Sequence, residues 1–411
     1  MTPRHRVTAT VTWPRANARR LARQHLTAPV PVPAPAPADV SAASSGAASA
    51  AEVVGAMLGA HAQVLSAAEL SVGLRGAGLT RADVRTALWA ERSGPGGGSE
   101  RGGRTLVKTF GPRGTVHLLP LADLPLWTGA LSALPVGPNL FAKDAGMTPD
   151  QVEAIGDVLT GAELTVDELS DEVVARTGPW AGDPVMPAFR TMWPRWRQVL
   201  HLAGHRGVLA YAPNRDRKTT YGNPGCTPLP GPEALAALIE RYLYAYGPAT
   251  PAHFARWLAA PVRWATARFA ALAASGAIEE VPFADEGAAW VVAGDTEFPD
   301  EPVRGARLLP YFDAFTIASQ PRERLFPGPA YERALGGGQA GNYPVLLVDG
   351  TVAGVWHQRR SGRRIAVTVE PLKRLSAARL RELERQVDRV AAVMEGTAEL
   401  TVGPVTVGPH A

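Results

Sequence analysis

Three neighbouring stretches decide the fold: VVGAMLGAHAQVLSAAELSVGLR at 53–75, LTRADV at 79–84 and RTLVKTFGPRGTVHLLP at 104–120. In the first stretch, apolar spacing predicts an opening helix whose inward stripe comprises Val54, Met57, Leu58, His61 and Leu65. Ser66 with Glu69 has the spacing of a capping box that opens a second helix, and Thr80 with Asp83 caps a third.

The third stretch predicts a hairpin, with strands at 105–110 and 115–119 around Gly-Pro-Arg-Gly. Three helices followed by a hairpin is the order of a winged helix, which is a helix-turn-helix variant with a β-wing. This order indicates a nucleic-acid-binding module at residues 51–140.

The same order recurs twice downstream. The second copy has predicted helices from 148 to 159, from 165 onward and from Val185 to Leu202, with wing strands at 207–211 and 218–221. The third has predicted helices at 233–245, 251–258 and 261–274, then strands at 277–283 and 288–292. After residue 304 the pattern is β-rich, with strands at 308–311, 343–348, 352–356 and 365–369, a helix at 376–395 and a strand-like tail.

We therefore predict an α+β protein with three tandem winged-helix modules followed by a small C-terminal β-barrel with a terminal helix. The modules are expected at 51–140, 141–228 and 229–303, and the barrel at 304–411. Residues 1–50 are expected to form an N-terminal arm or helix and a linker, because residues 30–50 are rich in Pro, Ala and Ser.

Composition narrows the class of protein. A single cysteine, Cys226, excludes an intramolecular disulfide framework and a cysteine-based zinc cluster, which suits a reducing compartment. No apolar run reaches the roughly 20 residues of a membrane helix, and Met1 to Arg20 lacks the apolar region of a secretory signal.

We expect a cytoplasmic, nucleoid-associated protein without membrane contact. Three unlike modules in one chain favour a monomer over a symmetric dimer.

The net charge is only +4, but basic residues are unevenly placed. Between 190 and 218 a single acid, Asp216, accompanies seven basic residues and two tryptophans, Trp193 and Trp196. Such a mixture predicts a surface that follows DNA phosphates, although core tryptophans beneath a solvated arginine face would give the same pattern. The seven residues are Arg190, Arg195, Arg197, Arg206, Arg215, Arg217 and Lys218.

Further basic residues lie at predicted hairpins. Lys108 and Arg113 belong to the first wing, where we expect DNA contact, and four arginines surround the Ser361-Gly362 turn: Arg359, Arg360, Arg363 and Arg364. These four either bind DNA or serve solubility, and the sequence leaves both readings open. By contrast, 279–301 holds eight acids and no base, so this segment is expected to face away from phosphate.

Candidate chemistry is confined to a few residues, because no phosphate-binding loop, dinucleotide fingerprint or zinc-protease motif is present. His61 and Gln63 stand at the expected end of the first helix, where they could hold one water between them. His61 would act as a base and Gln63 would orient the water. The alternative is a core histidine satisfied by a backbone carbonyl and a surface glutamine, and spacing alone favours it.

His201 and His205 have the i, i+4 spacing of a metal-binding pair. No third ligand is close in sequence and the neighbouring residues are basic, so we favour phosphate contact or a structural role. We expect neither a metal nor another cofactor.

The three opening stretches, extended to Trp127, and the later LLPYFDAF (308–315) and VLLVDGTVAGVW (345–356) resemble the AlkZ/YcaQ-type winged-helix DNA glycosylases. The resemblance implies three winged-helix units and a barrel that form a C-shape around duplex DNA. It also implies removal of bulky N7-alkylated purines, unhooking of interstrand crosslinks and, in many members, self-protection of genotoxin producers.

Catalysis in that family rests on a Gln-apolar-Gln or Gln-apolar-Asp motif, which falls here on His61-Ala62-Gln63. Gln63 matches the second position, whereas His61 replaces the usual first glutamine. The leading hypothesis is a monofunctional DNA glycosylase that acts on alkylated or crosslinked double-stranded DNA. One alternative is a non-catalytic DNA-binding protein, either a regulator or a lesion shield. Another is docking of a protein partner by the barrel and the acidic segment 279–301.

Overall fold

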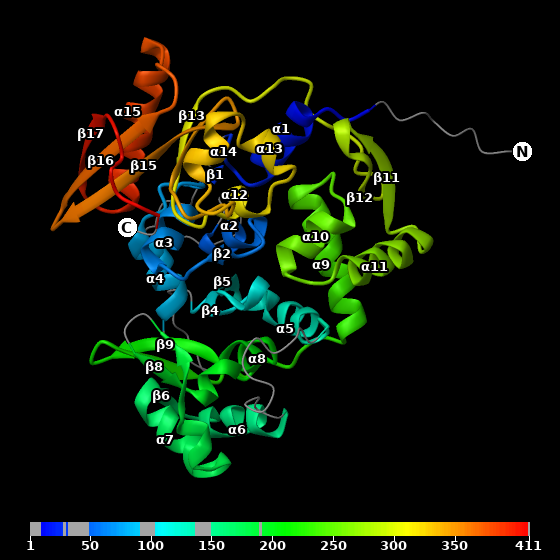
Figure 1. Cartoon of the computed structure of the whole chain (residues 1–411), viewed down its shortest axis with the longest axis vertical. Coiled ribbons are helices and arrows are strands. Elements are labelled where there is room, and N and C mark those ends of the chain that lie inside the picture. Colours follow the sequence, from blue (N-terminus) through cyan, green and yellow to red (C-terminus); the bar gives the residue numbers. More distant parts are fainter. Residues whose placement is uncertain are drawn as a thin grey trace, which may run out of the picture. The chain divides into compact units, whose positions relative to one another are not determined.

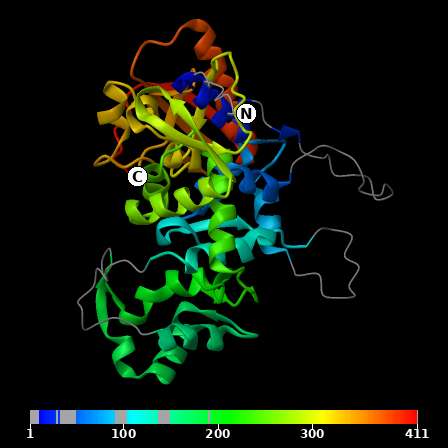
Figure 2. The same cartoon turned by 90° about the vertical axis from the view of Figure 1, so that its right-hand side faces the viewer.

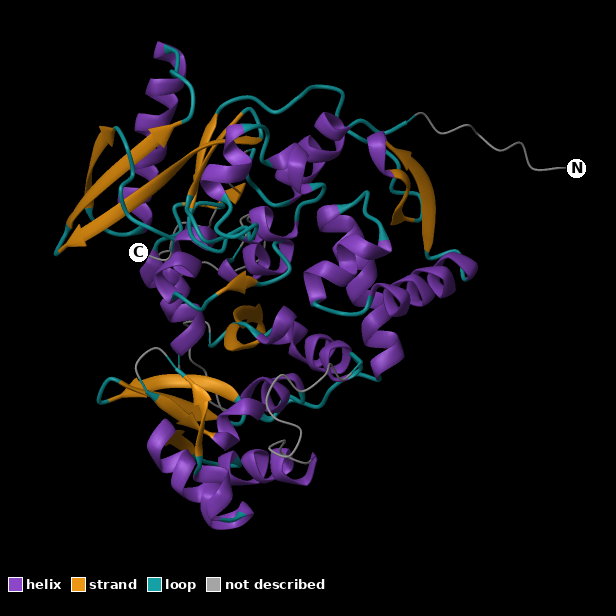
Figure 3. Cartoon of the chain, viewed as in Figure 1, coloured by secondary structure: helices purple, strands orange, loops and turns teal. Residues whose placement is uncertain are grey.

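The computed structural model describes residues 10–27, 30–31, 49–90, 103–135, 149–188 and 191–409 (Figure 1). The chain divides into two compact units, and helices and strands occur in both (Figure 3). Unit 1 comprises Met1–Arg85, Ile239–Trp257 and Val262–Ala411, and unit 2 comprises Thr86–Leu238 and Leu258–Pro261. The division crosses helix α4 (Arg81–Trp89), so the first predicted module is shared between the two units.

The largest sheet belongs to unit 1. Its strands follow the order β13 (Ala306–Leu309), β14 (Val345–Val348), β15 (Thr351–Ser361), β16 (Arg364–Pro371) and β17 (Thr397–Val402). All neighbours are antiparallel except β16 and β17, which run parallel because helix α15 (Ala377–Val393) connects them. Among the described strands, β13 and β17 end this order without pairing to each other, so the sheet is open where a closed barrel was expected.

Each face of this sheet is covered by helices. On one face, α15 buries Leu383, Val387 and Val390 against Trp356 and Val367. On the other face lie four short helices: α1 (Trp13–Arg23), α12 (Ala314–Ala318), α13 (Arg322–Leu325) and α14 (Pro329–Ala334). Figures 1 and 2 show the N-terminal α1 among the C-terminal elements. Sequence periodicity missed the three helices between β13 and β14, because each is too short to show a helical repeat.

The remainder of unit 1 begins with α2 (Ala50–Ala56), β2 (Ala60–His61), α3 (Leu65–Gly73) and β3 (Gly76–Ala77), which pairs with β1 (Val30–Pro31). The third predicted module, most of which belongs to unit 1, shows three helices, α9 (Gly231–Tyr246), α10 (Pro251–Leu258) and α11 (Val262–Ala274), and the first half of α9 belongs to unit 2. The hairpin of β11 (Ile278–Phe283) and β12 (Gly287–Val292) follows. The order and bounds agree closely with the sequence prediction.

Unit 2 contains the hairpin of β4 (Leu106–Phe110) and β5 (Val116–Pro120), followed by α5 (Leu124–Ser132). Next come α6 (Pro149–Leu159), β6 (Glu163–Thr165) and α7 (Val166–Thr177), which opens on the predicted Thr165–Glu168 capping box. Strands β9 (Ala210–Arg215) and β10 (Lys218–Gly222) form a hairpin, and β10 also pairs with β6. The second strand agrees with the prediction, whereas β9 lies later in the chain than the strand predicted at 207–211. Within the described ranges, no helix is long and apolar enough to span a membrane.

The long third helix predicted from Val185 to Leu202 is wrong. The segment instead forms a small hairpin of β7 (Pro184–Pro187) and β8 (Met192–Pro194), a 3₁₀ turn η5 (Arg195–Val199) and the short α8 (Leu200–His205). Three prolines explain the difference, because proline lacks the amide proton of a helix and holds the preceding residue extended. Helical structure therefore starts only after Pro194.

Candidate active site

The helix before the His61–Gln63 motif ends earlier than its apolar spacing predicts. α2 opens on a Ser49–Glu52 capping box and ends at Ala56. The Gly59 amide donates to Val54 O at 3.0 Å and the Leu58 amide donates to Gly55 O at 3.0 Å, which is a Schellman motif. Leu58 adopts φ 55° where glycine is usual, and this uncommon choice concealed the helix end from sequence reading.

His61 therefore lies on the short strand β2 rather than on a helix. Its side chain is buried, with 8% of its surface exposed, whereas Gln63 is exposed. The imidazole stacks on the Phe312 ring, with centroids 4.5 Å apart and planes inclined by 27°. One face of the imidazole is thus covered, and the plane of the ring is fixed.

A buried ion pair holds Phe312 in this position. The next residue, Asp313, accepts hydrogen bonds from the two terminal nitrogens of Arg75 at 2.8 Å each, and both side chains are 0% exposed. Ser71 on α3 donates its hydroxyl to the same carboxylate at 2.5 Å, and Asp313 also caps α12. Because α3 follows the motif directly, this network ties the motif to the segment that carries Phe312.

The conformation of Phe312 requires a glycine beside it. Phe312 adopts φ 55°, and its amide donates to Gly341 O at 3.0 Å. A Cβ on Gly341 would lie 3.1 Å from the Phe312 ring and 3.2 Å from its Cα, closer than most Cβ contacts. The stacking partner of His61 is therefore held by a backbone hydrogen bond and close packing at Gly341 as well as by the Asp313 network.

The second predicted cap is wrong, and one of its residues has another role. α3 begins at Leu65 with Val64 as its N-cap, so Ser66 does not cap it. Glu69 is 0% exposed and accepts a hydrogen bond from Arg85 Nε at 2.6 Å. Glu69 thus anchors the start of α4, whose own cap of Thr80 and Asp83 is present as predicted.

Several basic residues expected to contact DNA have acidic partners in unit 2. Arg195 pairs with Asp183 at 3.1 Å, Lys218 pairs with Asp167 at 2.8 Å, and Arg215 pairs with Glu168. The acids precede the basic residues in sequence, so a count confined to 190–218 could not include them. Trp196 is fully buried, as the core alternative required, whereas Trp193 is 39% exposed beneath Arg197.

The other residues of unit 2 that were predicted to contact DNA differ in their exposure and in their contacts. Lys108 Nζ lies 4.5 Å from the centre of the Tyr211 ring, and Arg113 occupies the β4–β5 turn at φ 62°. Arg206 is half-buried, and Arg217 is exposed in the β9–β10 turn. Arg190 lies outside the described residues.

The four arginines of the β15–β16 turn, Arg359, Arg360, Arg363 and Arg364, form what we call the basic tip. All four are exposed at the end of a long hairpin of unit 1 (Figure 1). Arg360 donates to Gly362 O at 2.8 Å and to Met394 O at 2.7 Å, so it stabilises the hairpin.

Comparison with known proteins assigns the chain to a family. The family model described as DNA glycosylase AlkZ-like matches residues 54–393, which include His61, Gln63, Phe312 and Asp313. The chain belongs to the AlkZ-like family. It is 33% identical over 337 residues, 75% of this chain and 82% of the relative, to the interstrand DNA cross-link repair glycosylase of Streptomyces sahachiroi. The solved structure of DNA glycosylase AlkZ from the same organism is similar, with a TM-score of 0.71, 26% identity and coverage of 96% of this chain and 100% of that one.

In this AlkZ-like protein the acidic segment 279–301 has partners within unit 1. Asp295 pairs with Arg23 at 2.5 Å, and Asp300 pairs with Arg15 at 2.7 Å. Arg19 stacks over Phe298 at 3.6 Å. Helix α1 therefore contacts the surface that the sequence suggested for a partner protein.

The two histidines of unit 2, His201 and His205, contact each other, and His205 also contacts the backbone. His205 is buried with Nε2 3.1 Å from Gly111 O, and its ring meets His201 edge-on at 5.7 Å. Burial lowers the pKa of His205 to about 4. The described residues contain no group of three potential metal ligands, and burial argues against phosphate contact by His205.

Sequence reasoning missed the role of Phe312, Asp313 and Arg75. The run LLPYFDAF was noticed only as part of a family resemblance. Arg75 and Asp313 are 238 residues apart, and no local pattern indicates such a pair. An arginine and an aspartate inside otherwise apolar runs were the only available signal.

Proposed function

We propose that this AlkZ-like protein is a monofunctional DNA glycosylase that removes bulky N7-alkylated purines and unhooks interstrand crosslinks in duplex DNA. It would hydrolyse the N-glycosidic bond at the His61–Gln63 motif. The observation that carries the proposal is the match of the DNA glycosylase AlkZ-like family model to residues 54–393, which include His61 and Gln63. The crosslink-repair relative supports the substrate class.

The chemistry suits this pair of side chains. Alkylation at N7 gives the purine a positive charge, so the base leaves without an acid to protonate it. The protein then has to stabilise an oxocarbenium-like sugar and direct water to C1′. Gln63 would orient the water through its amide, and the neutral imidazole of His61 would accept or orient a proton. This scheme needs no metal.

Phe312 would act as a positioning residue in this reaction. Its ring covers one face of the imidazole and fixes the plane in which the ring nitrogens lie. Hydrogen-bond geometry decides the efficiency of proton transfer, so a freely rotating imidazole would be a weaker catalyst. The Asp313–Arg75 pair supplies the rigidity that keeps Phe312 in place.

We further propose that the three segments of helices and hairpins act as winged-helix modules on DNA. The exposed basic tip of unit 1 and Arg217 of unit 2 are the candidates for phosphate contact. The protein would act as a monomer in the cytoplasm, in association with the nucleoid.

The test is a base-release assay on duplexes that carry simple and bulky N7-alkylguanine adducts. Gln63→Ala is expected to slow release by about 10²- to 10⁴-fold, the usual contribution of one general acid–base or water-orienting group. His61→Ala is expected to act similarly, whereas His61→Gln restores the usual motif residue and is expected to retain part of the activity. Gln339→Ala, at an exposed glutamine elsewhere in unit 1, serves as the matched control.

DNA binding is measured in parallel for every variant. Equal affinity with slower release assigns the motif to catalysis. Tight binding of all adducts without base release would instead support a lesion-binding protein and refute the glycosylase proposal.

A further inference from the structure

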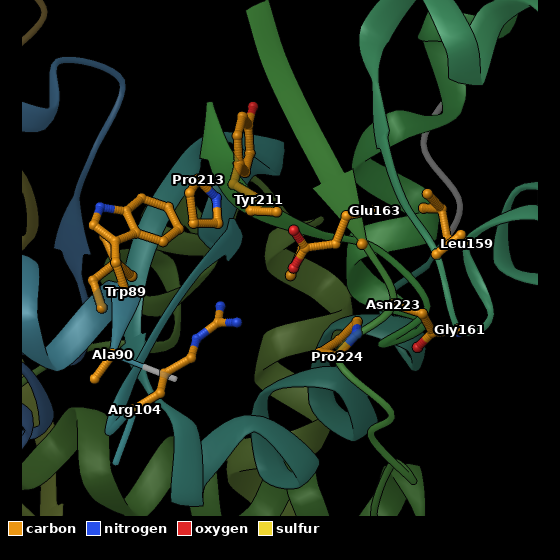
Figure 4. Close-up of a pocket in the computed structure, with 15 residues that line it drawn as sticks. Trp89, Ala90, Arg104, Leu159, Gly161, Glu163, Tyr211, Pro213, Asn223 and Pro224 are labelled. Atoms are coloured by element: carbon orange, nitrogen blue, oxygen red, sulfur yellow. The ribbon is translucent and has the colours of Figure 1, made fainter. Parts of the chain in front are cut away.

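A cavity of about 470 Å³ lies entirely within unit 2, and none of its lining residues belongs to the His61–Gln63 motif. Its walls come from the end of α4, the segment before β4, the α6–β6 connection, β9 and the segment after β10 (Figure 4). The chemistry proposed for the motif does not explain this cavity.

Three side chains give the cavity its chemical character. The Trp89 indole forms an aromatic wall beside Pro213 (Figure 4). The Arg104 guanidinium and the Glu163 carboxylate point into the space from separate sides (Figure 4). The cavity thus offers a flat apolar surface, a cationic donor and an anionic acceptor.

Backbone contacts hold both charged residues in place. Arg104 Nε donates to Leu106 O at 2.9 Å, which fixes the plane of the guanidinium. Arg215 donates to the backbone oxygen of Glu163 at 3.0 Å, and Glu163 pairs in register with Gly222. A Cβ on Gly222 would lie 3.3 Å from Glu163 Cγ, so the glycine leaves room for the glutamate side chain.

Guanine is the base whose hydrogen-bonding groups match this arrangement. Its N1–H and N2–H₂ groups donate from one edge, and O6 and N7 accept on another, where arginine binds them well. Adenine has no two adjacent N–H donors on one edge, because its N6–H₂ group lies between the N1 and N7 acceptors, so it cannot make the double contact with a carboxylate that guanine can make. Stacking on tryptophan suits any base and adds affinity without selectivity.

We propose that this cavity binds the guanine base of a nucleotide. The base stacks on Trp89, the Glu163 carboxylate accepts from N1–H and N2–H₂, and Arg104 donates to O6 and N7. Unit 2 would thus hold an undamaged guanine nucleotide, and this role does not depend on base release at His61.

The test is calorimetric titration of the full chain with guanosine monophosphate, adenosine monophosphate and cytidine monophosphate. Saturable binding of the guanine nucleotide alone is expected. Glu163→Gln removes the charged acceptor and is expected to weaken this binding roughly ten- to a hundredfold. Trp89→Leu is expected to weaken binding of guanosine monophosphate by about tenfold or more. Glu172→Gln, at an exposed glutamate on α7, is the matched control and should leave binding unchanged.

Circular dichroism and retained DNA binding verify that each variant is folded. The absence of saturable heat with guanosine monophosphate would overturn the proposal. Equal affinity for adenosine monophosphate would overturn it too, as would full affinity in folded Glu163→Gln. His61→Ala is expected to bind the nucleotide normally, so failure of the glycosylase proposal and failure of this one are distinguishable.

Discussion

Removing the Asp313 carboxylate tests the whole arrangement around His61. In Asp313→Ala the Arg75 guanidinium, which is 0% exposed, stays buried without its counter-charge. Loss of one partner from a buried pair costs about 3–5 kcal/mol. The substitution also removes the cap of α12, in which Asp313 accepts from the Phe315 amide at 3.0 Å, worth about 1 kcal/mol. We expect the free energy of local unfolding around α3 to fall by about 5 kcal/mol.

A double variant separates the charge from the geometry. Arg75→Met with Asp313→Leu removes both charges and fills the space with apolar groups, so no buried charge remains uncompensated. This double variant is expected to be more stable than Asp313→Ala by several kcal/mol. Its base release should nevertheless remain slow, because Phe312 loses the tether that holds it on His61.

Hydrogen–deuterium exchange with mass spectrometry is the suitable assay, because it reports local opening in a protein of two units. Peptides from α3 and β2 should exchange much faster in Asp313→Ala, while peptides from α7 in unit 2 serve as the internal control. A loss of protection below about 1 kcal/mol would refute the reasoning. A double variant less stable than the single one would refute it as well.

Three further predictions follow from other parts of the chain. Burial lowers the pKa of His205 from 6.5 to about 4, so folded unit 2 binds fewer protons than the unfolded chain in that window. The free energy of unfolding of unit 2 should therefore fall by up to about 3 kcal/mol as the pH drops from 6.5 to 4. Urea unfolding midpoints should depend less on pH in His205→Gln than in the natural protein, and equal pH dependence in the two would contradict this prediction. Replacing the basic tip by glutamines should reduce the slope of log affinity for DNA against log salt by about 0.9 per lost phosphate contact. Arg381→Gln, at an exposed arginine on α15, should not change the slope, and equal slopes would exclude the tip from the interface. A Cβ on Gly73 would lie 2.3 Å from Val393 Cγ1, so Gly73→Ala should cost about 1–3 kcal/mol in thermal unfolding, and rescue by Val393→Ala would show that α15 is the obstacle.

The sequence predicted those elements whose pattern is local. The third module, α9 to β12, was placed within a few residues because its helices and strands have clear periodicity and proline starts. The segment 185–202 failed because its apolar spacing suggested a helix while Pro184, Pro187 and Pro194 opposed one. Where periodicity and proline disagree, the structure follows the proline, since a missing amide proton cannot be compensated by burial alone.

The candidate site was only partly predictable, for a different physical reason. The position of the motif was recognisable, but Leu58 in the left-handed region conceals the end of α2, because glycine normally marks such an end. The contacts that give His61 its environment join residues far apart in the chain, such as the stacking of His61 on Phe312. Long-range pairs of this kind leave no periodic signal, so a single sequence indicates candidate residues such as His61 without their partners.

The distribution of charge shows the same limit of reasoning from sequence alone. It also changes which surface is the better candidate for binding DNA. Counted along the sequence, the segment 190–218 holds seven bases and one acid. In three dimensions Arg195, Arg215 and Lys218 each meet a carboxylate from an earlier element, so much of their charge is already balanced. The basic tip has a shorter run of charge but is exposed at the end of a hairpin. Because counterion release depends on cations that reach phosphate, the basic tip is the stronger candidate for the electrostatic part of DNA binding.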